Sequence, residues 1–258
     1  MKIDNVLRIA KKEFHEHKKR VFWTFVSMLM ISALFLLPAI FDPWESDTQL
    51  FEKYINKNQL MKTADRSNVF VMFLIDIKLP LYIFLATFLS PLFGIMESII
   101  NEKENRTLEA LFVLPTTDQE IIFGKMLVSL SSGIMLPWLL YIFYMLLFSF
   151  MCNTTIALFF LQFKWLFIMI ILVPNSAFFI NLVGISIASN TKTLQSCYLY
   201  AFIILSPLFV ILILVSIGTI FISIKILLVI TILLIPLTVL SFFIAIWSFR
   251  REKILLRY

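Results

Sequence analysis

The sequence predicts an all-α integral membrane protein, on the strength of its composition and the pattern of its apolar residues. Of the 258 residues, 60% are hydrophobic and only 15% are charged, whereas soluble domains have about 45–50% apolar and about 25% charged residues. The apolar residues stand in continuous runs, without the alternation with polar residues that a membrane β-barrel requires. A water-soluble fold and a barrel are therefore excluded.

Six predominantly apolar runs are long enough to cross a bilayer. The hydrocarbon core is about 30 Å thick, and a helix that rises about 1.5 Å per residue crosses it in roughly 20 residues. These runs form one transmembrane domain over 21–258, with an outer loop at 42–69 and a large inner loop at 97–125. The predicted spans are about 21–41, 70–96, 126–152, 165–189, 197–216 and 226–249.

The positions of the basic residues predict the orientation. Fifteen of the 22 Lys and Arg fall in residues 1–20, 97–125, 189–196 and 250–258, and cytoplasmic segments carry such an excess. Both termini are therefore predicted to lie in the cytoplasm, with the chain in the cytoplasmic membrane. The net charge of +6 then reflects orientation, and we expect no nucleic-acid partner.

The first 20 residues predict an amphipathic helix that lies on the inner leaflet. Apolar residues recur there at spacings of three and four, with lysine and arginine around the rest of the helix. His15 and His17 are two residues apart and point to different faces, so we expect no metal site. The apolar positions are Ile3, Val6, Leu7, Ala10 and Phe14.

Residues 101–125 are the most charge-dense inner segment and encode two short helices. The first runs over about 101–113 and ends before Pro115, because the residue that precedes a proline is disfavoured in helical geometry. The second begins at Thr117, whose hydroxyl can cap the free amides while Glu120 reaches back to form a capping box. This spacing alone is equally compatible with a helix that transmits force between a soluble motor protein and the spans and with a helix that is only part of a surface loop.

The same segment resembles the corresponding loop of the type-2 ABC transporter permeases. That loop has the pattern E-x-E-x-G-T-L-E, then apolar residues and a proline, then a short helix with Gly-Lys at the start of the third span. Arg106 stands where the family usually has glycine, so we expect the turn or contact served by that glycine to differ. The Lys12-Glu13-Phe14 run and the six spans extend the resemblance. The matching positions are Glu102, Glu104, Thr107, Leu108, Glu109, Pro115, Gly124 and Lys125.

The resemblance implies the permease subunit of an ATP-driven exporter, with no catalytic residue of its own. Its partners would be a cytoplasmic ABC ATPase dimer, a second permease that is identical or related, and membrane lipid. No G-x-x-x-x-G-K-[ST] motif is present, so the partner would bind ATP and Mg, and this chain needs no cofactor. The coupling helix that docks on the ATPase would comprise Thr117, Asp118, Gln119, Glu120, Ile121, Ile122 and Phe123.

Few ionisable residues lie within the predicted spans, which argues against a proton-driven transporter and an intramembrane enzyme. Asp76 and Lys78 lie in the interfacial lead-in of the second span, before its uncharged run begins at residue 79, and are expected at the outer headgroups. In the fourth span a stripe of small residues with an asparagine predicts close helix packing. The stripe is Ala177, Asn181, Gly184 and Ala188, and the candidates for a substrate path are Asn175, Ser176 and Asn181.

Met and Phe are abundant in the first and fifth predicted spans, which suits a hydrophobic or amphiphilic substrate such as a drug, a peptide or a lipid-like molecule. Lipid-facing surface explains the same residues equally well. Two other functions stay open from the sequence. One is an immunity or sensor component that works with an ATPase without bulk transport. The other is a secondary transporter, which should show intramembrane charges or an inverted repeat.

Overall fold

The computed structural model describes residues 3–41, 66–105, 117–152, 158–216 and 223–249, and within these ranges it contains helices and no strand. The predicted all-α class is confirmed for this part of the chain. The elements are α1 (Ile3–Phe41), α3 (Arg66–Glu104), α5 (Asp118–Cys152), α7 (Phe163–Phe167), η2 (Ile168–Leu172), α8 (Val173–Asn190), α9 (Leu194–Ser216) and α10 (Ile224–Ser248).

Five helical segments of the described chain are long and apolar enough to cross a membrane, and they coincide with the second to sixth predicted spans. The first predicted span, 21–41, lies within α1. The apolar stretch found there among the described residues, Val21–Ala33, is shorter than a span by itself, so the first predicted span stays a prediction. The five segments are Val71–Glu104, Gln119–Phe150, Phe163–Asn190, Leu194–Ile211 and Ile224–Ser248.

Two helices that the sequence predicts as separate are continuous with neighbouring spans. Helix α1 runs through residue 20 without a break, so the predicted interfacial helix 1–20 shares one helix with the first span. Helix α5 begins at Asp118, so the predicted coupling helix 117–123 forms its first turns. Neither junction contains proline, and Gly124 lowers helix propensity by only about 1 kcal/mol. Residues 106–116, with most of the predicted 101–113 helix, lie outside the described residues.

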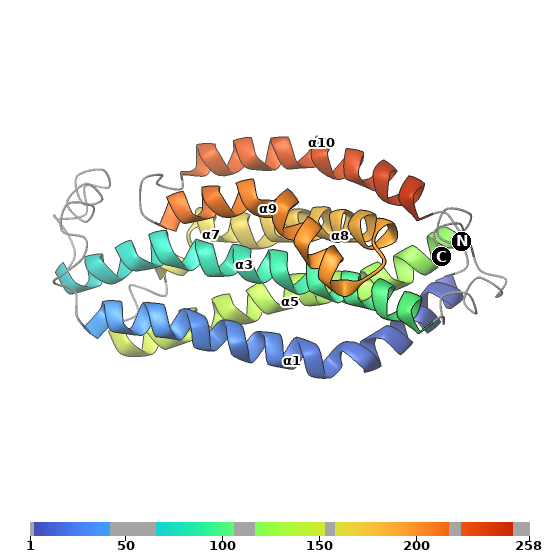
Figure 1. Cartoon of the computed structure of the whole chain (residues 1–258). Helices are drawn as coiled ribbons and strands as arrows, with labels where there is room; N and C mark the ends of the chain where they lie inside the picture. The colour runs from blue at the N-terminus through green and yellow to red at the C-terminus, as the bar shows by residue number, and fades with distance from the viewer. Residues whose placement is uncertain (1–2, 42–65, 106–116, 153–157, 217–222, 250–258) are drawn as a thin grey trace.

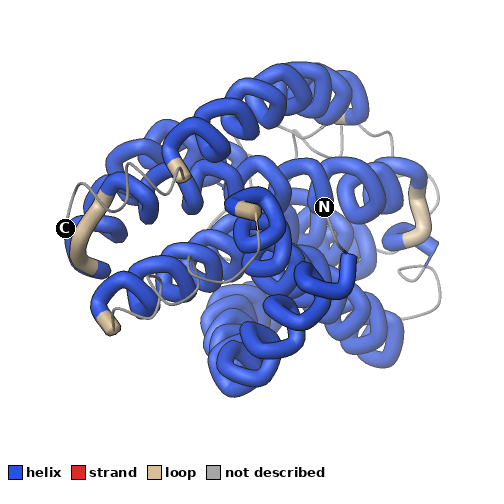
Figure 2. Tube along the Cα trace, turned by 90° about the vertical axis from the view of Figure 1, so that its right-hand side faces the viewer, coloured by secondary structure: helices blue, strands red, loops and turns tan. Residues whose placement is uncertain are grey.

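Helix α3 occupies the middle of the bundle. It packs against α1, α5, α8 and α9, while α10 packs mainly against α8. Figure 1 shows α1 and α10 on opposite sides of the bundle, with α3 between them. Figure 2 shows the same helices from one end. A displacement of α3 therefore reaches four neighbouring helices directly.

The small-residue stripe of the fourth span packs against α3 and α5, as predicted. Ala177, Asn181 and Ala188 are fully buried. At Gly184 an added Cβ would lie 2.5 Å from Ile95 Cγ2 of α3, so a side chain there has no room. Asn181 forms a hydrogen bond with Ser129 of α5, which is the cross-helix role expected of it.

The fourth span contains a π-helical turn, η2, which the sequence analysis did not predict. It lies between α7 and α8, directly before Pro174 at the start of α8. Pro174 has no N–H to donate to the carbonyl of Ile170 one turn earlier, and π-helical turns commonly occur at such irregular positions. The indole Nε1 of Trp138 on α5 donates to the Met169 carbonyl at 3.2 Å, which ties α5 to this turn.

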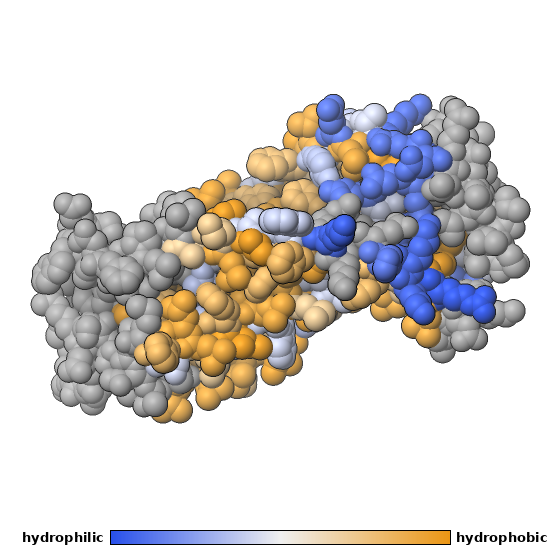
Figure 3. Space-filling view, turned by 90° about the horizontal axis from the view of Figure 1, so that it is seen from below, coloured by the Kyte–Doolittle hydropathy of each residue, from blue (hydrophilic) through white to orange (hydrophobic). Residues whose placement is uncertain are grey.

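Polar residues gather at one end of the bundle, which we call the charged end; it holds the starts of α1 and α5 and the ends of α3, α8 and α10. Figure 3 shows hydrophilic residues there and a hydrophobic surface beside them. Asp76 lies toward the opposite end, where its Oδ1 is 2.8 Å from Lys164 Nζ. The location of Asp76 at the outer headgroups stays a prediction.

Candidate functional site

A buried ammonium group joins three helices at the charged end. Lys125 of α5 is 2% exposed. Its Nζ lies 2.6 Å from Glu13 Oε1 on α1 and 2.9 Å from Glu102 Oε2 on α3, and it donates to Ser98 Oγ of α3 at 2.6 Å. Lys12 of α1 lies 3.4 Å from Glu102 Oε1. We call Lys12, Glu13, Ser98, Glu102 and Lys125 the ion network.

The ion network has the composition that buried charges require. Removing each ion from water costs several kcal/mol, so a buried ion pair stays favourable only with good geometry and satisfied hydrogen bonds. An ammonium has three donors; Lys125 donates to Glu13 Oε1 and to the carbonyl and hydroxyl oxygens of Ser98, and its contact with Glu102 Oε2 is an ion pair without a hydrogen bond. Among the described side chains of the network, two carboxylates face two ammonium groups. The network therefore fixes α1, α3 and α5 relative to one another at this end.

Gly124 permits the close approach of α1 to α5 that the network needs. A Cβ at this position would lie 2.8 Å from Ile9 Cβ and 3.2 Å from the Val6 carbonyl oxygen on α1. Glu13 follows Ile9 by four residues and so lies on the same face of α1. The Gly-Lys pair thus combines a helix contact at Gly124 with a buried cation at the next residue.

The start of α5 carries the predicted capping box. The backbone N–H of Thr117 donates to Glu120 Oε2, and the N–H of Glu120 donates to Thr117 Oγ1, both at 3.3 Å. Thr117 and Gln119 are exposed, whereas Glu120, Ile121 and Ile122 are buried. The buried residues hold the turn against the bundle, and Thr117 and Gln119 are the predicted docking residues that face outward.

The remaining predicted residues divide into three groups. Phe123 is half-buried, with its ring centroid 6.4 Å from that of Phe242 on α10. Glu104 is exposed at the end of α3. The others lie outside the described residues: the side chain of Asp118, and Arg106, Thr107, Leu108, Glu109 and Pro115.

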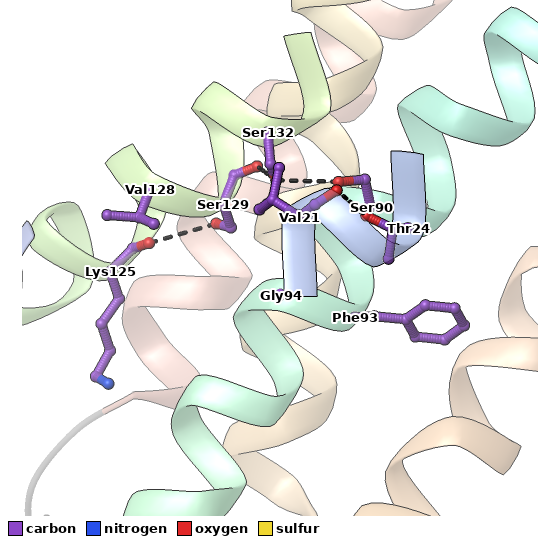
Figure 4. Close-up of a pocket in the computed structure, with 9 residues that line it drawn as sticks. All are labelled: Val21, Thr24, Ser90, Phe93, Gly94, Lys125, Val128, Ser129 and Ser132. Atoms are coloured by element: carbon purple, nitrogen blue, oxygen red, sulfur yellow. Dashed lines mark hydrogen bonds between the residues drawn. The ribbon is translucent and has the colours of Figure 1, made fainter. Parts of the chain in front are cut away.

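A small pocket lies between α1, α3 and α5, next to the ion network. Figure 4 shows the ammonium of Lys125 directed away from the three serines that line the pocket, Ser90, Ser129 and Ser132. The serine hydroxyls are engaged within the protein, because Ser90 donates to Ser132 and Ser132 to the Ser129 carbonyl. The pocket therefore offers apolar walls and hydroxyls that already have partners. Its lining is Val21, Thr24, Ser90, Phe93, Gly94, Lys125, Val128, Ser129 and Ser132.

The three candidates for a substrate path lie on α8. Asn181 is fully buried, and its Nδ2 donates to the Ala177 carbonyl at 3.0 Å in addition to its bond with Ser129. Ser176 is also fully buried and donates to the carbonyl of Leu172. Asn175 is half-buried. None of the three lines the pocket between α1, α3 and α5.

Glu13 and Ser98 are residues that the sequence analysis did not place in a site. Glu13 entered only as part of the run that resembles the family. It shares a helix face with Val6 and Ile9, at spacings of seven and four, and an acid on an apolar face needs a buried partner. The position of Glu13 on that apolar face is the feature of the sequence that could have indicated its buried partner. No cluster of three or more His, Cys, Asp or Glu suited to a metal ion occurs among the described residues.

Five helical segments of the described chain that are long and apolar enough to cross a membrane, in a bundle whose polar residues gather at one end, define a multi-pass membrane protein. The sequence profile of the ABC-2 family transporter proteins matches residues 7–253, which covers nearly all of the chain. The chain therefore belongs to the ABC-2 transporter family and is the membrane subunit of an ABC transporter, not itself a catalytic enzyme. No curated protein and no solved structure matches it.

Proposed function

We propose that this chain is the permease subunit of an ATP-driven exporter in the cytoplasmic membrane, and that a separate ATPase docks on the start of α5. One observation carries this proposal: the exposed turn at Thr117 and Gln119 stands on the same rigid helix as Lys125 of the ion network. A force applied to that turn is thereby delivered to three helices together.

The distance between the turn and the network is short. Lys125 follows Thr117 by eight positions, which corresponds to about 12 Å along an α-helix at about 1.5 Å per residue. The capping box keeps the first turn helical, and the burial of Ile121 and Ile122 holds it on the bundle. A translation or rotation applied at Gln119 therefore moves α5 as a unit. Because Lys125 is paired with Glu13 of α1 and Glu102 of α3, these two helices move with α5.

The charged end is the cytoplasmic end in this proposal. Arg8, Lys11 and Lys19 of α1 are exposed there, and cytoplasmic segments are enriched in such residues. The partners are then two ATPase subunits that bind ATP and Mg, a second permease that is identical or related, and the surrounding lipid. Both chain termini lie in the cytoplasm.

The substrate class is hydrophobic or amphiphilic. The pocket between α1, α3 and α5 has apolar walls such as Phe93 and Val128, and the charged residue in its lining, Lys125, is engaged in the ion network. A strongly charged solute would find no unengaged counterion in that lining. A drug, a hydrophobic peptide or a lipid-like molecule fits these surroundings, and its direction of movement is outward.

Photo-crosslinking from Gln119 tests the docking site. A photoreactive amino acid at Gln119 in native membranes should capture a soluble ATPase with a P-loop motif, identified by mass spectrometry, because this side chain is exposed beside the capped turn. Gln162 provides the matched control, since it is also an exposed glutamine but lies next to Lys164, near the opposite end of the bundle.

Equal capture of the ATPase from Gln119 and Gln162, or its capture from Gln162 alone, would contradict docking at the start of α5.

A further inference from the structure

Lys103 of α3 is a second buried ammonium, and it binds a helix that the ion network does not reach. It directly follows Glu102 and is 4% exposed. Its Nζ donates to the carbonyl oxygens of Ala188 at 2.7 Å, Ser189 at 2.9 Å and Thr191 at 3.1 Å. Neighbouring residues of one helix thus bind different partners, Glu102 towards α1 and α5 and Lys103 towards α8.

The end of α8 is chemically suited to this contact. The last carbonyls of an α-helix have no partner within the helix, and together they form the negative pole of its dipole. Helix α8 ends at Asn190, and Thr191 takes an extended conformation that leaves the helix. The three donors of the ammonium match these three carbonyls, which is the arrangement that makes burial of a lysine favourable.

Other bonds from the same two turns of α3 complete the set. Tyr198 of α9 donates to Glu97 Oε1 at 2.6 Å, and Ser98 accepts from Lys125 of α5. Residues 97–103 of α3 therefore hold α1, α5, α8 and α9. The family pattern E-x-E sets no residue type at the position of Lys103, so the resemblance by itself does not imply the link to α8.

We infer that Lys103 is a positioning residue that makes the end of α8 move with α3 when the ATPase displaces the start of α5. The inference rests on the proposed function. When α5 is displaced, the ion pair between Lys125 and Glu102 moves α3 with it. The hydrogen bonds of Lys103 then move the end of α8 with α3. Export then changes the position of the fourth span as well as those of α1, α3 and α5.

Hydrogen–deuterium exchange of the permease alone tests the bond itself. Lys103→Met keeps the length of the side chain and removes its donors, so exchange at amides 185–190 should rise by about tenfold or more, because the end of α8 loses the bonds that hold it against α3 and its last turn opens more often. Lys103→Arg should restore protection, and Lys192→Met, which alters an exposed lysine just beyond α8, should leave it unchanged. Unchanged protection in Lys103→Met would overturn the inference.

The same measurement on the complex with its ATPase tests the transmission. Adding ATP should change exchange at 117–125 and at 185–190 in the wild type. In Lys103→Met the change at 117–125 should persist and that at 185–190 should be lost, and Lys103→Arg should recover it. A wild type that responds only at 117–125, or a Lys103→Met variant that still responds at 185–190, would refute the role of Lys103 and leave the proposed function standing. No response at either segment would refute the proposed function, and with it this inference.

Discussion

At the scale of single residues, buried cations dominate the charged end. Lys125 and Lys103 are both almost fully buried, and each has three or more oxygen partners on other helices. Each therefore joins helices that are far apart in the sequence, at a level of burial where an unpartnered charge would be strongly unfavourable.

Replacing Lys125 by methionine should destabilise the protein strongly. The substitution removes the buried cation that contacts Glu13 and Glu102, so that Lys12 is the lysine of the network that still pairs with Glu102. Loss of one partner of a buried ion pair costs about 3–5 kcal/mol. Thermal unfolding of the detergent-solubilised protein should show a lower midpoint. Lys11→Met removes an exposed lysine and should change the free energy of unfolding by about 0.5 kcal/mol or less. Equal midpoints for the two variants would contradict the assignment.

The residue-scale predictions from the sequence succeeded where the interaction is local. Thr117 and Glu120 are three residues apart, and their capping box is found as predicted. The bond between Glu13 and Lys125 joins positions 112 residues apart, and no periodicity in a single sequence relates them. The match at Gly124 and Lys125 pointed to the right place on α5 without showing its partner on α1.

At the scale of elements, hydropathy located the spans but not their junctions. The second to sixth predicted spans coincide with apolar helices. The continuity of 117–123 with α5 was not predicted, because the resemblance assigns these residues to a short helix that precedes the third span, whereas α5 runs through Gly124 without a break. The π-turn η2 has no marker in its own residues and depends on the proline that follows.

The contact between α3 and α8 predicts a compensating pair of substitutions. Gly184→Ala places a Cβ 2.5 Å from Ile95 Cγ2, and such overpacking typically costs about 1–3 kcal/mol. Ile95→Ala removes that methyl group, so the double variant should be more stable than the sum of the two single effects. Unfolding midpoints of all four proteins measure the coupling.

Gly94→Ala is the matched control on α3, because its added Cβ would meet Ser129 Cβ at an ordinary 3.4 Å. It should have little effect on the midpoint. Strict additivity of the Gly184 and Ile95 substitutions would show that these side chains do not meet as the structure places them.

At the scale of the whole molecule, α3 is the element through which the bundle is connected. It packs against α1, α5, α8 and α9 along the bundle, and its last two turns bond to the same four helices. Composition and run length were sufficient to predict a helical membrane protein, because lipid requires helices whose backbone bonds are satisfied internally. The central position of α3 depends on tertiary contacts and was not predictable from one sequence.

The central claim, that a separate ATPase drives this membrane subunit, is tested most directly by what accompanies the chain from its native membrane. The tagged protein should be purified in mild detergent and the bound proteins identified by mass spectrometry. The account predicts a soluble ATPase with a P-loop motif, at one copy per permease, together with a second copy of this chain or a related permease. Recovery of this chain alone, repeated after crosslinking, would contradict the claim and favour a secondary transporter.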